Sequence, residues 1–137
     1  MTPAQVALVQ ESFAKVVPIK EAAANLFYTR LFEIDPGTRP LFARSDMGQQ
    51  GAKLMATLAV VVNGLSRPET VVPAAEALAR RHVGYGVTEA QYASVGAALL
   101  WTLKQGLGEG FTPDVKDAWT AAYTLLSGVM TAAARAA

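Results

Sequence analysis

One segment of the chain limits its possible folds more than any other. From Leu54 to Val62 the residues are apolar with the single exception of Thr57. Helix-favouring residues surround this segment, so we expect a helix from about Gln49 to Leu65. A helix that is apolar on nearly every side must be covered on two faces. Other parts of the chain, or a bound molecule, must therefore lie against both faces.

Helix signals recur along the rest of the chain, and strand signals are missing. Thr2 to Gln5 and Thr88 to Gln91 are capping boxes, in which a Thr and a Gln side chain satisfy the first backbone N–H groups of a helix. Alternating β-branched runs between turn residues do not occur. The sequence therefore predicts an all-α protein with one domain, 1–137. The expected helices lie at about 3–17, 23–34, 49–65, 68–82, 88–107 and 113–137, with a short helical turn before Phe42 and a polar, loose stretch over 43–48.

Charge and composition exclude several classes of function. The 12 basic and 11 acidic residues nearly balance, and the basic ones form no dense stripe, so we expect no nucleic-acid partner. No export signal or membrane span is recognisable, which makes a cytoplasmic location the default expectation. Cysteine is absent, which excludes disulfides, thiolate chemistry and zinc sites that need sulfur. The apolar fraction of 52% is high for a small protein. This apolar fraction indicates either an apolar surface or an interior that encloses an apolar molecule.

His82 is the only histidine, so every site that needs two imidazoles is excluded. One interpretation is a surface histidine near a helix C-terminus, where a cation suits the helix dipole. The alternative is an imidazole that points inward. Leu78, one helical turn earlier, would then share its face, and Val87 and Tyr92 would reach the same space.

A second set of residues supports the inward orientation. On the helix expected over 49–65, one stripe of side chains is polar at its N-terminal end and largely apolar beyond it. Such a wall suits a flat apolar ligand that carries one reactive polar centre. The stripe consists of Gln50, Leu54, Thr57, Leu58 and Val61.

Five short motifs, in order and at suitable separations, resemble the globin domain of bacterial flavohaemoglobins and their single-domain relatives. The resemblance covers essentially the whole chain, and it implies a globin fold, a helical sandwich around haem b. The motifs are Leu26 to Phe32, Pro40 to Phe42, Gln50 with Lys53 and Leu54, Arg80 to His82, and Gln91 and Tyr92 with Val95 and Gly96.

The resemblance assigns roles at the centre of the site. It makes His82 the proximal iron ligand, with its other ring nitrogen donating to a backbone carbonyl near Leu78. It makes Phe42 the ring that stacks on the porphyrin, although ordinary core packing is an equally compatible role. Tyr28 and Gln50 correspond to the distal tyrosine and glutamine. The alternative for Tyr28 is a core ring whose hydroxyl reaches outward.

Further residues would complete the cofactor pocket. Arg81 and Lys53 would pair with the haem propionates, and their alternative is a solvated charge. The pocket walls would come from Leu54, Leu78, Val87, Tyr92 and Val95.

Two departures from the family pattern limit the expected chemistry. In flavohaemoglobins the tyrosine that matches Tyr92 works with a late glutamate to make the proximal imidazole strongly electron-donating. Ala134 occupies that place here, which puts peroxidase-like chemistry in doubt. The length of 137 residues leaves no room for the flavin and nicotinamide reductase domains.

Three functions follow as expectations. The first is reversible, high-affinity dioxygen binding at a five-coordinate ferrous haem, for storage or scavenging, with Tyr28 and Gln50 as hydrogen-bond donors. The second is nitric oxide dioxygenase activity that depends on a separate reductase. The third is a haem-based sensor or a haem-free interaction module. The protein is expected to be a monomer or a homodimer.

Overall fold

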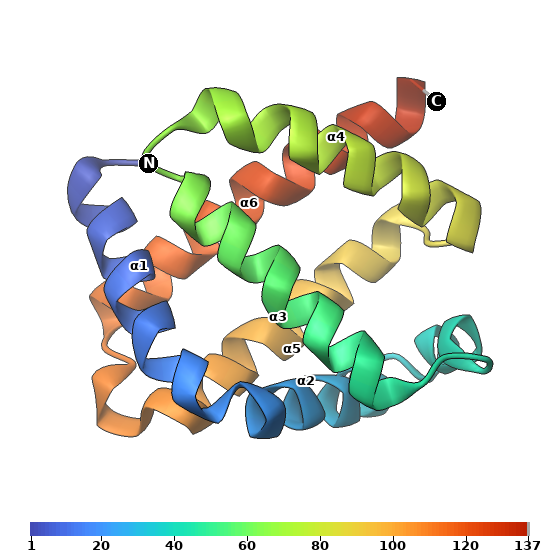
Figure 1. Cartoon of the computed structure of the whole chain (residues 1–137), viewed down its shortest axis with the longest axis horizontal. Coiled ribbons are helices and arrows are strands. Elements are labelled where there is room, and N and C mark those ends of the chain that lie inside the picture. The colour runs from blue at the N-terminus through green and yellow to red at the C-terminus, as the bar shows by residue number, and fades with distance from the viewer. Residues whose placement is uncertain (137) are drawn as a thin grey trace.

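The computed structural model describes residues 1–136, and it confirms the all-α prediction: these residues contain helices and no strand. Figure 1 shows their course through the molecule. The α-helices are α1 (Pro3–Val16), α2 (Lys20–Ile34), α3 (Met47–Gly64), α4 (Pro68–Tyr85), α5 (Glu89–Leu107) and α6 (Pro113–Ala136), with 3₁₀ turns η1 (Val17–Ile19), η2 (Pro36–Phe42) and η3 (Gly108–Gly110).

Both predicted capping boxes are present. At the start of α1 the Thr2 amide donates to Gln5 Oε1 over 3.0 Å, and the Gln5 amide donates to Thr2 Oγ1 over 3.1 Å. At the start of α5 the Thr88 amide donates to Gln91 Oε1 over 2.9 Å. These bonds satisfy backbone donors that the first turn of a helix leaves without partners.

Three helix boundaries differ from the prediction. Helix α2 begins at Lys20, directly after the η1 turn, and not at residue 23. Helix α3 begins at Met47, two residues early, because the Asp46 carboxylate accepts the Gln49 amide over 3.1 Å and caps it there. Helix α4 continues past Gly84 to Tyr85. It ends at Gly86, whose φ of 86° lies in the left-handed region that a glycine adopts without steric cost.

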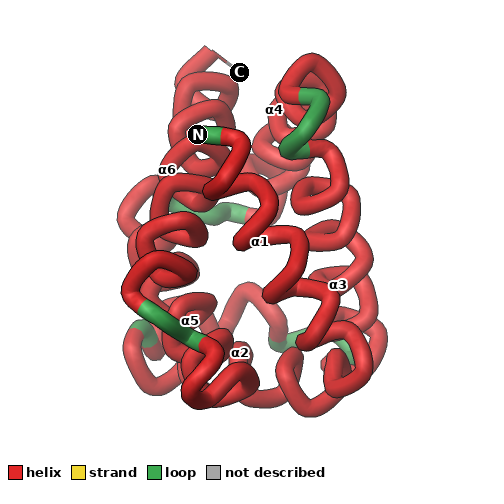
Figure 2. Tube along the Cα trace, turned by 90° about the vertical axis from the view of Figure 1, so that its left-hand side faces the viewer, coloured by secondary structure: helices red, strands yellow, loops and turns green. Residues whose placement is uncertain are grey.

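The helices form the helical sandwich that the sequence predicts (Figures 1 and 2). Helix α2 packs mainly on α5 and α3, and α1 packs on α6. Helix α4 packs mainly on α6, and both views place it beside the C-terminal half of that helix. The site helices α3 and α4 are therefore held by different partners. Within the described chain, no helix is long and apolar enough to cross a membrane.

Two groups of buried side chains hold these helices together. The larger, here called the main core, joins α1, α2, α3, α5 and α6. In it the rings of Phe13 and Trp119 lie 6.2 Å apart, and Trp119 Nε1 donates to the buried Ser12 Oγ over 2.8 Å. The smaller, here called the α4 cluster, consists of Ala75, Ala79, Tyr92 and Met130.

The apolar helix α3 is covered less completely than the sequence predicts. Met55 and Val62 are buried in the main core, and Leu54 and Leu58 pack against it. Val60, however, is 60% exposed. The reason is that α3 makes its main contacts with α2 and fewer with α1 and α4, so part of its apolar surface faces outward.

Candidate functional site

His82 lies on the last turns of α4, partly buried. Its Nδ1 is 2.9 Å from the carbonyl oxygen of Leu78, one turn earlier on the same helix. A carbonyl only accepts, so Nδ1 carries the proton and Nε2 keeps its lone pair. The hydrogen bond expected near Leu78 is therefore present, and the imidazole is left with one free acceptor nitrogen.

The surroundings of His82 favour the neutral imidazole. Burial lowers its pKa, the Leu78 carbonyl raises it in part, and the positive charge of Arg81 lowers it further. A neutral imidazole with a free nitrogen is the form that binds a metal ion.

Aromatic rings flank the imidazole. The ring of Tyr92, from α5, is stacked with that of His82, with 6.5 Å between the ring centres and 22° between the planes. The ring of Tyr85 lies 6.0 Å away, and this residue is mostly exposed. Next to them, the Val87 amide donates to the His82 carbonyl and closes the end of α4. The structure therefore brings His82, Leu78, Tyr92 and Val87 together at one place.

The second part of the site lies on α2 and η2. The Tyr28 side chain is buried, with 7% of its surface exposed. Its ring meets the ring of Phe42 edge to face, with 5.3 Å between the centres, and it also contacts the rings of Phe27 and Phe32. Such edge contacts are favourable beyond the area they bury. They fix the direction in which the Tyr28 hydroxyl points.

Gln50, from the first turns of α3, lies near this hydroxyl. Burial raises the pKa of Tyr28, and the neighbouring Gln50 side chain offsets part of the rise. The phenol therefore stays protonated at neutral pH and keeps a proton to donate. The structure thus brings together Tyr28, Gln50 and Phe42, three residues from three separate helical elements.

The predicted wall residues divide between the two groups of buried side chains. Leu54 and Val95 pack against the main core. Leu78 and Val87 pack against the α4 cluster, to which Tyr92 itself belongs. Tyr92 is buried, and the other four wall residues are each partly buried. The site therefore lies where the two groups of side chains meet.

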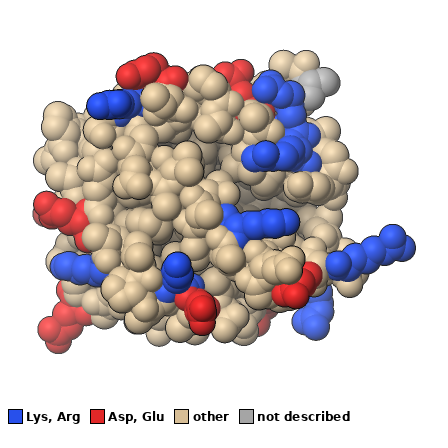
Figure 3. All heavy atoms as spheres, in the orientation of Figure 1, with Lys and Arg blue, Asp and Glu red and all other residues tan. Residues whose placement is uncertain are grey.

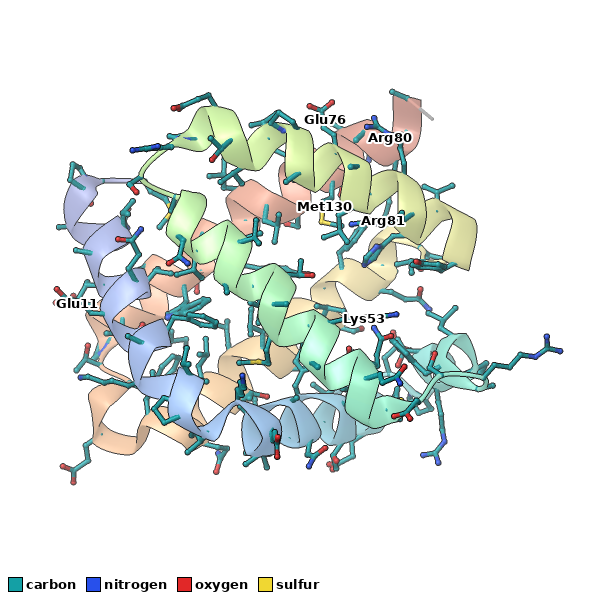
Figure 4. The ribbon with its side chains drawn as sticks, viewed as in Figure 1. Glu11, Lys53, Glu76, Arg80, Arg81 and Met130 are labelled. Atoms are coloured by element: carbon teal, nitrogen blue, oxygen red, sulfur yellow. The ribbon has the colours of Figure 1, made fainter. Side chains whose placement is uncertain are left out.

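The two predicted cations lie at the edge of the site. Lys53 on α3 and Arg81 on α4 are both exposed, and Figure 4 shows them on the two helices that border the region between α3 and α4. Figure 3 shows that several of the Lys and Arg side chains on this face lie on its right-hand side, over this part of the molecule. The rim there can attract an anionic group.

Sequence reasoning missed Tyr123 on α6. Its hydroxyl donates to the backbone carbonyl of Tyr92, and burial raises its pKa strongly. A Cβ atom at Gly96 would lie 2.7 Å from the Tyr123 ring, so only glycine admits the ring at this distance. Gly96 in the middle of a predicted helix was the one signal of a close contact with another helix.

Ala134, the departure from the family pattern, leaves no carboxylate at its position on α6. One acidic side chain lies near Tyr92 nevertheless: the charge of Glu89 raises the pKa of Tyr92 somewhat, after the larger effect of burial. The Glu89 carboxylate is held by Arg135 in two hydrogen bonds of 2.7 and 3.0 Å. It is therefore bound to a guanidinium and not to the tyrosine hydroxyl.

The donor set fits one kind of metal group. Over residues 1–136, no three His, Cys, Asp or Glu side chains gather closely enough to hold a metal ion. His82 offers a single neutral nitrogen beside apolar walls. Such a residue suits a metal that brings its other ligands with it, as the iron of a porphyrin does.

Comparisons with known proteins point in the same direction. Residues 25–130 match the family described as Globin. The flavohemoprotein of Bordetella parapertussis is 34% identical over 138 residues, which cover 99% of this chain. The flavohemoprotein of Rhodopirellula baltica is 28% identical over 124 residues, covering 89% of the chain, and that of Vibrio cholerae is 29% identical over 119 residues, covering 82%.

The shared region is a minor part of these relatives. The matched segments cover 34% of the Bordetella protein and 30% of each of the other two. The chain therefore spans about a third of the length of the curated relatives that it matches.

Proposed function

Because the chain belongs to the globin family, we propose that it binds haem b and, through the haem iron, dioxygen. The observation that carries this proposal is the state of His82. Its Nδ1 is engaged by the Leu78 carbonyl, its pKa is lowered by burial, and Nε2 is left as the free acceptor. A proximal iron ligand needs this tautomer and this charge.

The surrounding residues have the chemistry to hold such a cofactor. Haem supplies an iron atom that binds small gases and a flat apolar ring with two carboxylates. Phe42 and Leu54 offer apolar contacts to the ring, and Val87 and Val95 offer further ones. Arg81 and Lys53, exposed at the rim, are the cations that would pair with the carboxylates.

Tyr28 and Gln50 would set the affinity for the gas. A ligand that takes up electron density from a metal is stabilised by nearby hydrogen-bond donors. Tyr28 keeps its proton because burial raises its pKa, and the Gln50 amide lies beside it. A hydrogen bond to a charged acceptor contributes about 1.5–3 kcal/mol, so each donor would tighten binding by about tenfold or more. We expect slow release of dioxygen, which suits storage or scavenging.

The test compares absorption spectra of the purified protein, oxidised and reduced, with those of His82→Ala. We expect the wild-type protein to show a Soret band and the variant to lose it or shift it, with partial recovery when imidazole is added. Val83→Ala, an exposed neighbour on the same helix, is the matched control and should leave the spectrum unchanged. An unchanged spectrum in His82→Ala would refute the assignment of this ligand. A folded, colourless protein after haem is offered would establish the haem-free alternative.

A second candidate function is the oxidation of nitric oxide to nitrate. Two observations favour it: the match to flavohemoproteins over 99% of the chain, and the Tyr28 and Gln50 side chains at one place. The reducing equivalents would come from a separate reductase, and a cytoplasmic location stays the prediction of the sequence. Mixing the oxygenated protein with nitric oxide should give one nitrate per haem. Sustained turnover after a reductase is added would favour an enzyme, and a single turnover only would favour storage.

A further inference from the structure

An apolar cavity lies at the C-terminal end of α3, away from His82. Its volume is about 100 Å³. Val61 and Leu65 from the end of α3, Val71 from α4, and Leu126 and Val129 from α6 form its walls, with Val6 of α1 closing one side. Val61, which the sequence places on the ligand-facing stripe of α3, lines this cavity instead; none of the other residues predicted above for the haem pocket does.

The chemistry of the walls is uniform. Every side chain that lines the cavity is apolar, and Val61, Leu65 and Val71 are themselves buried. A water molecule needs two to four polar partners to be held in a buried site, and these side chains offer none. The site therefore favours an uncharged hydrocarbon over water or a polar ligand.

The size of the cavity also restricts its occupant. Another apolar void, between Phe13, Leu58 and Trp119, is about 20 Å³, enough for little more than one water. A cavity of about 100 Å³ is in the range that accepts a small ring or a short alkyl chain. An empty space of this size forfeits van der Waals contacts along all its walls, and an apolar guest would restore them.

The cavity has a mouth through which a guest can enter. Met1, Val72 and Leu125 line it too, and all three are exposed large apolar side chains. None of the side chains that line the cavity or its mouth is charged, so an apolar molecule meets no charge among them.

We propose that the cavity between the end of α3, the start of α4 and α6 is a second binding site, specific for a small uncharged hydrocarbon such as a short alkyl chain or a benzene-sized ring. This site is separate from the one around His82, since its walls include none of the residues that the structure brings together there. A guest there would tie α4 to α3, which otherwise make only limited contacts.

The test uses benzene as the probe and the methyl NMR signals of the purified protein as the readout. We expect benzene to shift the methyl signals of Leu65, Val71 and Val129 in a saturable manner. Val129→Phe fills the cavity from α6 and should weaken this binding at least tenfold. Val60→Phe, on the exposed side of α3, is the matched control and should bind benzene as the wild type does.

A second variant shows whether weaker binding in Val129→Phe comes from a filled cavity or from a folding defect. Ala122→Val narrows the cavity from another wall and should weaken benzene binding without unfolding the protein. The proposal is overturned if no methyl signal shifts at saturating benzene, or if Val129→Phe and Ala122→Val both bind as tightly as the wild type. It is also overturned if only Leu54, Val87 and Val95 respond, because benzene would then occupy the pocket around His82.

Discussion

The main core and the α4 cluster hold the two halves of the site in different ways. The main core joins five helices and contains large aromatic side chains, among them Phe13, Phe27 and Trp119. The α4 cluster contributes only Ala75 and Ala79 from the helix that carries His82, packed against Tyr92 and Met130. Burying an alanine gains much less free energy than burying a large side chain. Tyr28 and Phe42 thus pack in a group of large side chains, and the helix that carries His82 contributes only small ones to its cluster.

This difference implies that ligand binding and folding are coupled on one side of the site only. A molecule that contacts His82 would add to the contacts that α4 makes, mainly with α6, and binding to the native state alone raises stability by mass action. Tyr28 and Phe42 would be in place with or without it, because the main core already fixes them.

The largest expected effect tests the main core. Trp119→Ala should destabilise the protein by about 3–5 kcal/mol, since it removes a buried ring, its contact with Phe13 and the hydrogen bond to Ser12. Urea denaturation measures the change. Trp101→Ala, at a partly exposed ring on α5, is the control and should cost less. Equal losses in both variants would remove the distinction between main core and periphery.

The next prediction compares the two groups of side chains directly. Met130→Ala in the α4 cluster and Met55→Ala in the main core each remove a buried thioether side chain, at a cost of about 2 kcal/mol or more. In the haem-free protein we expect Met130→Ala to speed hydrogen exchange mainly at the amides of α4. Met55→Ala should instead act on the whole molecule. Uniform acceleration in both variants would show that α4 does not open separately.

A smaller effect tests the contact between α5 and α6 beside the site. Gly96→Ala would place a Cβ atom 2.7 Å from the Tyr123 ring, and this overpacking should cost about 1–3 kcal/mol. Gly128→Ala on α6, where nothing lies within 4 Å, should stabilise the helix by about 0.5–1 kcal/mol instead. Thermal unfolding measures both changes: the midpoint temperature should fall in Gly96→Ala and rise in Gly128→Ala. A neutral Gly96→Ala variant would mean that the two helices can separate freely.

The smallest effect concerns alkaline pH. Burial raises the pKa of Tyr123 above that of the unfolded chain, about 10. The unfolded chain therefore releases this proton first, so the stabilisation is complete below pH 10 and is lost as the pH rises above it. Tyr123→Phe removes one hydrogen bond, about 1 kcal/mol, and should make the fall in stability above pH 10 shallower. Denaturation midpoints between pH 7 and pH 11 provide the measurement. An equally steep fall in the variant would assign the effect to other tyrosines.

Features that depend on near neighbours could be predicted from the sequence. The capping boxes at Thr2 and Thr88 join residues three apart, and the bond from His82 to Leu78 spans one helical turn. The end of α4 was misplaced at about His82. Gly84 is compatible with a helix and exposed, and the chain needs a left-handed residue only at Gly86.

Features that depend on packing between distant helices could not be predicted. The bond from Tyr123 to the Tyr92 carbonyl joins residues 31 positions apart on α6 and α5. The cavity lined by Val61, Val71 and Val129 depends on how α3, α4 and α6 are placed relative to one another, which no local pattern encodes. The family resemblance supplied Tyr28 and Gln50 as partners, and their proximity agrees with it.

The hydrogen bond between His82 and Leu78 has a mechanical consequence. The orienting carbonyl belongs to the same helix as the imidazole, one turn away. Any rigid shift of α4 therefore carries the ring and its orienting partner together, so that the direction of Nε2 is preserved relative to the helix axis. Movement of α4 would change how far the nitrogen reaches, while its tautomer would stay the same.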